Sequence, residues 1–160
     1  MTLQIRRVVT GHDSEGRAIV KIDQTENSPP QAFGGVDFVS VWSTEGFPVD
    51  NSGDEDEVDS VTGITRPRRT HFTIVQVHPG NQPVPHRTAT IDYAVIMSGE
   101  IDMELEEGEL VHLKAGDVLV QRGSWHNWLN KGDEPCVIAF ALIDSQPVAA
   151  GGKTLEATIA

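Results

Sequence analysis

The chain has 160 residues, of which 38% are hydrophobic and 22% are charged, a size and composition typical of one globular domain with a buried core. Twelve Lys and Arg against 24 Asp and Glu give a formal net charge of −12, which disfavours nucleic acid and anionic membranes as partners. The lack of a secretory leader and of a long apolar run predicts a cytoplasmic protein, and Cys136, the single cysteine, cannot form an intramolecular disulfide.

Residues 1–70 are predicted to supply strands and long loops that wrap a barrel. Arg6 to Thr10 and Arg17 to Ile22 are expected to pair as a hairpin around the Gly11-His12-Asp13 turn. Phe38 to Trp42 is expected to form a further short strand.

The polar stretches 24–35 and 44–69 hold too little apolar surface for a core of their own, so we expect both to be loops. The second stretch contains an acidic run from Asp54 to Asp59. This run lacks the ligand spacing of a calcium-binding loop, and a solvated surface loop is therefore the expectation.

Residues 71–148 are predicted to form the barrel, and 149–160 a surface tail. Short runs rich in Val, Ile and Leu, separated by Gly, Pro and Asn, are typical of strands in such folds. The expected strands include Phe72–Val77, Asp92–Met97, Leu110–Lys114 and Val137–Ile143. Apolar and polar residues alternate after Gly99 and predict a half-buried strand. The residues expected inside are Ile101, Met103, Leu105, Val118 and Ile138.

Two segments of the barrel carry candidate metal ligands. In the first, His86, Thr88, Thr90 and Asp92 lie at even spacing, so their side chains share one face of an extended chain. In the second, His126 follows a turn at Gly123. Two imidazoles and a carboxylate from adjacent strands match the facial triad that leaves open positions on Fe(II) and related ions.

The first segment resembles the first motif of the cupin superfamily, which reads G-x5-H-x-H-x3/4-E-x6-G. Gly80, His86, Thr88, Asp92 and Gly99 fall at these intervals. Thr88 stands where the family has its second histidine, and Asp92 where the family has glutamate.

The second segment resembles the family's second motif, P-x-G-x2-H-x3-N. Gln121, Gly123, His126 and Asn130 occupy that register, with Gln121 in place of proline. The resemblance implies an all-β fold, namely a single-domain cupin double-stranded β-helix, or jelly-roll barrel, that is usually a homodimer. It also implies one divalent metal, iron, manganese, nickel or zinc.

The predicted ligands of that ion are His86, Asp92 and His126. Thr88 is at best a weak ligand, and Asp92 is one methylene shorter than the glutamate of the family. The alternative is that both histidines are hydrogen-bonded to Asp92 in a site without an ion. Thr88, Trp128 and Asn130 are predicted to line the ligand pocket.

Other histidines are expected to be peripheral. His71 and His78 are seven residues apart and face opposite sides of a regular strand, so at most one reaches the inside, and each is expected at the surface or rim. Alternation places His112 and Tyr93 on the outside of the barrel.

Three functions remain open at this point. The first is a metal-dependent enzyme acting on a small organic acid or carbonyl compound by decarboxylation, dehydration, isomerisation or dioxygen insertion. The second is a non-catalytic cupin that binds or senses a small ligand. The third is a metal-free isomerase or lyase in which His86 or His126 is a general base oriented by Asp92.

Overall fold

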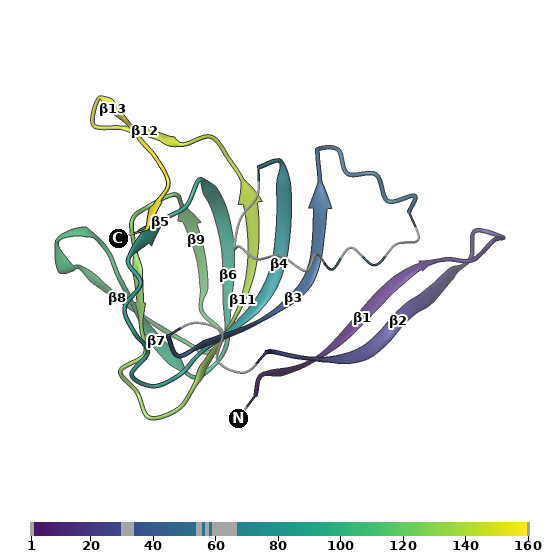
Figure 1. Ribbon diagram of the computed structural model, residues 1–160, viewed down its shortest axis with the longest axis horizontal. Helices are drawn as coiled ribbons and strands as arrows, with labels where there is room; N and C mark the ends of the chain where they lie inside the picture. Colours follow the sequence, from purple (N-terminus) through teal and green to yellow (C-terminus); the bar gives the residue numbers. More distant parts are fainter. Residues whose placement is uncertain (1, 30–33, 54–55, 57, 59–66, 160) are drawn as a thin grey trace.

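A computed structural model describes residues 2–29, 34–53, 56, 58 and 67–159. Two antiparallel sheets form the barrel (Figure 1), and the larger has the strand order β3-β4-β11-β6-β9. Its strands are β3 (Val36–Glu45), β4 (Arg69–Val77), β6 (Thr90–Ser98), β9 (Val118–Arg122) and β11 (Cys136–Asp144). The smaller sheet has the order β10-β7-β8, with β7 (Glu100–Glu104), β8 (Leu110–Lys114) and β10 (Asn127–Leu129). The all-β jelly-roll expectation is confirmed.

The core lies between the two sheets. The larger sheet contributes its inner face, defined here by Ala94, Ile96, Ile138, Phe140 and Leu142. The smaller sheet contributes Ile101, Met103 and Leu113 to the same cluster. These residues alternate with exposed or half-buried neighbours along each strand, because successive side chains of a strand point to opposite faces. The expected burial of Ile101, Met103 and Ile138 is confirmed, while Leu105 is half-buried against the cluster.

The prediction that Val118 lies inside is wrong, because its side chain is 74% exposed. Val118 pairs with the exposed Val95, whereas the next residue, Leu119, pairs with the buried Ala94. Residues directly opposite each other in an antiparallel pair share a face, so the register with β6 decides which residues of β9 point inward.

The expected N-terminal hairpin is present and longer than predicted, with β1 (Gln4–His12) paired to β2 (Ala18–Asn27). The hairpin extends away from the barrel as a two-stranded ribbon (Figure 1). Near its base, Leu3 packs with Val39 and Ile74 in a small second cluster. A two-stranded ribbon alone is marginally stable in water, so this contact with the barrel anchors it.

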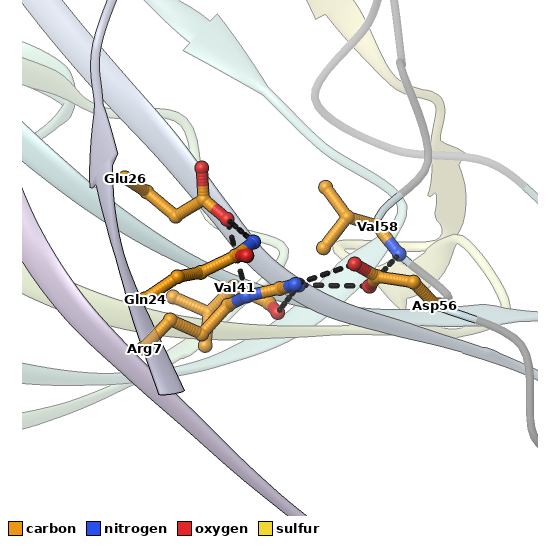
Figure 2. A network of polar contacts seen from close by, with 6 residues as sticks. All are labelled: Arg7, Gln24, Glu26, Val41, Asp56 and Val58. Atoms are coloured by element: carbon orange, nitrogen blue, oxygen red, sulfur yellow. Dashed lines mark hydrogen bonds and ion pairs between the residues drawn. The ribbon is translucent and has the colours of Figure 1, made fainter. Parts of the chain in front are cut away.

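Arg7 forms a second anchor for the hairpin. Its side chain is only 1% exposed, and the guanidinium forms ion pairs with Glu26 of β2 at 3.3 Å and with Asp56 at 2.5 Å (Figure 2). Arg7 also donates a hydrogen bond to the carbonyl oxygen of Val41 in β3. A buried guanidinium needs such partners, so Asp56 of the acidic run is bound to the hairpin rather than only solvated. Residues 54, 55, 57 and 59 of that run lie outside the described residues.

In the segment predicted to be a surface tail, the described residues 149–159 are largely exposed and also contain strands. A hairpin of β12 (Val148–Ala150) and β13 (Lys153–Leu155) leads to β14 (Thr158–Ile159). This last strand pairs with β5 (His86–Arg87), which carries one of the candidate site residues. Within the part of the chain that the structure describes, no helix has the length and apolar character needed to cross a bilayer.

Candidate functional site

The two motif histidines lie side by side. His86 and His126 form an antiparallel bridge in which each backbone N–H donates to the other's carbonyl oxygen at 2.9 Å. Their ring centroids are 4.1 Å apart. The backbone pairing therefore places two imidazoles next to each other, as the spacing of the two motifs predicts.

Hydrogen bonds to backbone carbonyls orient both rings. His86 Nδ1 donates to the carbonyl oxygen of Val84 at 2.7 Å, and His126 Nδ1 donates to that of Ser124 at 3.1 Å. A carbonyl oxygen can only accept, so these contacts place a hydrogen on each Nδ1, and Nε2 is the nitrogen of each ring that can offer a lone pair. Metal-binding histidines commonly have this arrangement, with one nitrogen fixed by the protein and the other available to the ion.

His126 is the more deeply buried of the two rings. It is 2% exposed, and desolvation together with the neighbouring His86 lowers the pKa of His126 from 6.5 to about 4. This imidazole is therefore neutral at physiological pH. The side-chain amide of Gln121 also contacts His126 Nδ1, and an Nδ1 that carries a hydrogen requires the amide oxygen rather than the amide nitrogen of Gln121 on this side.

Asp92 lies on the inner face of β6, directly opposite Gln121 of β9. The residue is 4% exposed, and Oδ1 is buried without a hydrogen-bond partner among the described residues. Desolvation raises the pKa of Asp92 from 3.8 to about 6, and a hydrogen bond with Thr90 lowers it by less. A buried carboxylate oxygen without a partner is costly, and such an atom is a suitable donor to a cation.

The structure does not bring the three candidate ligands together as one metal-binding group. No group of three His, Cys, Asp or Glu side chains is placed to hold a metal ion within the described residues. Among the described residues, no hydrogen bond joins Asp92 to either ring, so the alternative in which both histidines are hydrogen-bonded to Asp92 is not seen. The donor atoms of the three residues suit a divalent ion. In the structure, however, only the two imidazoles lie next to each other.

The three predicted pocket residues have different surroundings. Trp128 packs edge-on against His126 at 5.9 Å and against Phe140 at 5.8 Å, so it forms an apolar wall beside the histidines. The hydroxyl of Thr88 accepts a hydrogen bond from Thr90 at 2.7 Å. Thr88 is thus linked through Thr90 to Asp92.

Asn130 has a structural role. Its amide nitrogen donates to the carbonyl oxygens of Val77 and Glu134, both at 2.9 Å, and its amide oxygen accepts from Gly132 N. The side chain is fully buried and fixes the turn before β11. All of these bonds go to backbone atoms, so Asn130 shapes the end of the barrel rather than the surroundings of the histidines.

Gly123 allows the two motif segments to approach. Its φ of 59° is in the left-handed region, and a Cβ there would lie 2.9 Å from Val148 Cγ2 and 3.3 Å from the carbonyl oxygen of Thr88. Glycine is the residue that adopts this conformation without strain. The motif glycine is therefore required for the close packing that precedes His126.

Two residues near the site were not predicted from the sequence. Gln121 was noted only as a replacement for the family's proline, yet it faces inward and contacts His126. His71 was expected at the surface or rim, but it pairs with the inward-facing Leu142 and so shares the inner face. Two-residue alternation from Gly123 could have indicated Gln121, whereas nothing local indicates the face of His71. His112 and Tyr93 are exposed, as predicted.

An antiparallel jelly roll with two motif histidines on adjacent segments defines the double-stranded β-helix class. The cupin domain model matches residues 73–143, and the chain belongs to the cupin family. Phomopsin biosynthesis cluster protein C' of Diaporthe leptostromiformis is 36% identical over 157 residues, covering 93% of this chain and 83% of that protein.

One further curated protein and one solved structure are similar to this chain. The cupin-domain-containing oxidoreductase fogC of Aspergillus ruber is 29% identical over 161 residues, covering 96% of this chain and 79% of that protein. A candidate ethanolamine utilization protein Q from Salmonella typhimurium LT2 has a similar structure, with a TM-score of 0.51 and 14% identity. The superposition covers 90% of this chain and 99% of that one, and at this identity it shows the shared fold alone.

Proposed function

We propose that this chain is a metal-dependent cupin enzyme acting on a small organic acid or carbonyl compound. The observation that carries the proposal is the pair of adjacent imidazoles, with ring centroids 4.1 Å apart, each with Nδ1 within hydrogen-bond distance of a backbone carbonyl oxygen. The buried Oδ1 of Asp92 on β6, which has no hydrogen-bond partner among the residues that the structure describes, supports it. Buried polar atoms of this kind normally have a partner, and a cation would provide one.

His86 and His126 would hold the ion, with Asp92 as a third donor. A divalent iron, manganese, nickel or zinc ion would supply a Lewis acid for a carboxylate or enolate oxygen of the substrate. Gln121 and the Ser124 carbonyl orient the His126 ring. The indole of Trp128 restricts water at this ring, which strengthens electrostatic interactions beside it.

The reaction class follows from the relatives rather than from the geometry. Decarboxylation, dehydration, isomerisation and dioxygen insertion are all compatible with the ligand set. A relative named as an oxidoreductase favours oxidation among these, and a relative named for a biosynthesis cluster favours a biosynthetic role. We therefore propose a cupin oxidoreductase of a biosynthetic pathway, in the cytoplasm, with a small molecule rather than nucleic acid or a membrane as its partner.

A metal-free isomerase or lyase is the second candidate. It is favoured by the finding that no three-ligand cluster is placed to hold a metal ion within the described residues. In this case a neutral imidazole would be a general base toward a substrate C–H or O–H group.

Metal analysis of protein purified without a histidine tag separates the two candidates. We expect about one divalent ion per chain after loading with Fe(II), Mn(II), Ni(II) or Zn(II), and loss of that ion in His86→Ala and His126→Ala. His112→Ala is the matched control, because this histidine is exposed and lies outside the site. Full metal content in His126→Ala, or no metal in the parent after loading, would overturn the metal-dependent proposal.

We further propose that the protein is a homodimer. Exposed apolar side chains form a continuous patch on the outer face of the larger sheet, made of Tyr93, Val95, Met97, Val118 and Val120. Tyr93 pairs with Val120 and Val95 with Val118, so the patch runs across β6 and the edge strand β9. Contiguous exposed apolar surface marks an interaction site, and an edge strand next to it suits two-fold contact with a second copy.

Light scattering should give a dimer mass for the parent and a monomer mass for Val120→Glu. A monomeric parent would contradict the proposed homodimer.

A further inference from the structure

Two buried oxygen atoms without a hydrogen-bond partner lie on directly opposite residues beside the histidine pair. Asp92 of β6 pairs with Gln121 of β9, and the two residues are 4% and 3% exposed. Asp92 Oδ1 and Gln121 Oε1 both lack a partner among the described residues. Directly opposite residues of an antiparallel pair share a face and have Cβ atoms about 5 Å apart, so the two side chains are neighbours. Two neighbouring buried acceptors without a donor are unfavourable, because buried polar atoms normally have a partner.

The other side of the Gln121 amide faces His126. The amide nitrogen contacts His126 Nδ1 and lies 3.4 Å from the carbonyl oxygen of Ser124. His126 Nδ1 lies 3.1 Å from the same carbonyl oxygen, which places a hydrogen on Nδ1. Two N–H groups cannot hydrogen-bond to each other. In this orientation the amide therefore presents a donor to a donor and leaves its own oxygen without one.

A half-turn of the amide about the Cγ–Cδ bond of Gln121 removes these mismatches. The oxygen then accepts the hydrogen of His126 Nδ1, and the nitrogen takes the place of Oε1 and becomes available to the neighbouring carboxylate of Asp92. The turn gives up only the 3.4 Å contact with the Ser124 carbonyl, which is long for an N–H···O hydrogen bond. The two orientations of a glutamine amide have nearly the same shape, so the hydrogen-bonding partners decide between them.

We propose that Gln121 is a positioning residue that links Asp92 to His126. Its amide nitrogen donates to the carboxylate of Asp92, and its amide oxygen accepts from Nδ1 of His126. This link holds the ring hydrogen on Nδ1 and keeps the lone pair on Nε2, the nitrogen that would bind an ion or remove a proton. Proline, which the cupin motif has at the position of Gln121, cannot form the link because it has no side-chain amide.

The inference deepens the proposed function and rests on it for the use of the Nε2 lone pair. The metal-dependent and the metal-free candidate both need that lone pair, so the link serves either reaction. A carboxylate oxygen has two lone pairs, so Asp92 Oδ1 can accept the amide hydrogen and still bind a cation.

The position of the ring hydrogen of His126 in metal-free protein tests the link. Long-range heteronuclear NMR of protein with isotope-labelled histidine, at neutral pH, distinguishes the ring nitrogen that carries the hydrogen from the bare one, and His126→Ala identifies the signals. The parent should carry the hydrogen on Nδ1. Gln121→Met, apolar and of similar length, should raise the ratio of the Nε2–H to the Nδ1–H form about fivefold, the factor expected for one net hydrogen bond.

Two variants serve as controls for that measurement. Gln121→Glu keeps an oxygen toward the ring of His126 and should keep the parent's ratio. Gln4→Met changes an exposed glutamine of the hairpin and should also behave as the parent.

Replacing Asp92 tests the other half of the link. No hydrogen bond joins Asp92 to the His126 ring among the described residues, so its effect on the ring should pass through Gln121. Asp92→Ala should shift the ratio in the same direction as Gln121→Met, whereas Asp92→Asn keeps an acceptor oxygen and should not. In the Gln121→Met background, Asp92→Ala should have no further effect, as expected of two residues that act through one link.

Zinc affinity connects the link to the site. Gln121→Met should bind Zn(II) about tenfold more weakly than the parent, because partners that orient a ligating histidine contribute at least this much. A parent that binds no Zn(II) would refute the metal-dependent function, and the ring measurements would still decide the inference. The Asp92 variants decide it as well if Gln121→Met does not fold.

Three results would overturn the inference. The first is a parent in which His126 carries its hydrogen on Nε2. The second is a folded Gln121→Met with the parent's ratio of the two forms. The third is an Asp92→Ala substitution that shifts the ratio equally with and without Gln121.

Discussion

Replacing Asp92 with Asn tests how a buried carboxylate affects stability when no metal is bound. Burial raises the pKa of Asp92 from 3.8 to about 6, so the folded state holds this proton more tightly than the unfolded state does. The group therefore contributes to stability below about pH 4, and that contribution is lost as the pH rises through 6. A shift of this size corresponds to about 3 kcal/mol, which Asn, uncharged and of similar shape, should recover at neutral pH.

His126 contributes the opposite pH dependence. Desolvation and the nearby His86 lower the pKa of His126 to about 4, so its contribution to stability is complete above about pH 6.5 and is lost as the pH falls to about 4. Between these limits the two groups oppose each other in the parent, and the free energy of unfolding should change little. In Asp92→Asn only the histidine contribution remains, so the stability of the variant should rise from pH 4 to pH 6.5.

Urea unfolding of chelator-treated parent and variant, near pH 4.5 and near pH 7.5, measures both effects. Asp102→Asn is the matched control, because a hydrogen bond from His112 lowers the pKa of Asp102 and its removal should bring no gain. The reasoning is refuted if Asp92→Asn is no more stable than the parent near pH 7.5, since the ionised carboxylate would then have a stabilising partner.

Three further predictions concern the core, the thiol and the hairpin. Ile138→Ala should lower the free energy of unfolding by about 3 kcal/mol because the side chain is 0% exposed, whereas Val118→Ala should change it by less than about 0.5 kcal/mol; similar losses in both would contradict the burial pattern. Burial raises the pKa of the Cys136 thiol to about 11, so Ellman's reagent near pH 8 should react only after denaturation, and rapid reaction of folded protein would be the opposite result. Arg7→Met removes the ion pairs to Asp56 and Glu26, so amides of β1 and β2 should exchange hydrogen several-fold faster while the barrel is unaffected; unchanged protection would show that Leu3 and its neighbours suffice as the anchor.

Local sequence patterns determined the fold class and the neighbourhood of the two histidines. Ile101 and Met103 alternate with polar residues, and an alternating strand has one apolar face whatever it packs against. The spacing of the two motifs predicted that His86 and His126 come together, and the Gly123 turn that precedes His126 is a local property of the chain. The alternation and the glycine turn depend on residues within a few positions of one another, whereas the approach of His86 to His126 was predicted from the resemblance of the two segments to the cupin motifs.

For residues outside an alternating pattern of apolar and polar side chains, only the tertiary structure decided which face of the sheet the side chain occupies. Val118 lies in an unbroken apolar run with Leu119 and Val120, so no alternation shows which face of the sheet its side chain occupies. Pairing with β6 determines that face. The inward direction of Ser43 and His71 likewise follows from a bulge and from the register with β11, a strand about 70 residues away along the chain. Pairing between distant strands is a non-local property, because a shift of one residue reverses every side chain without changing the composition of either segment.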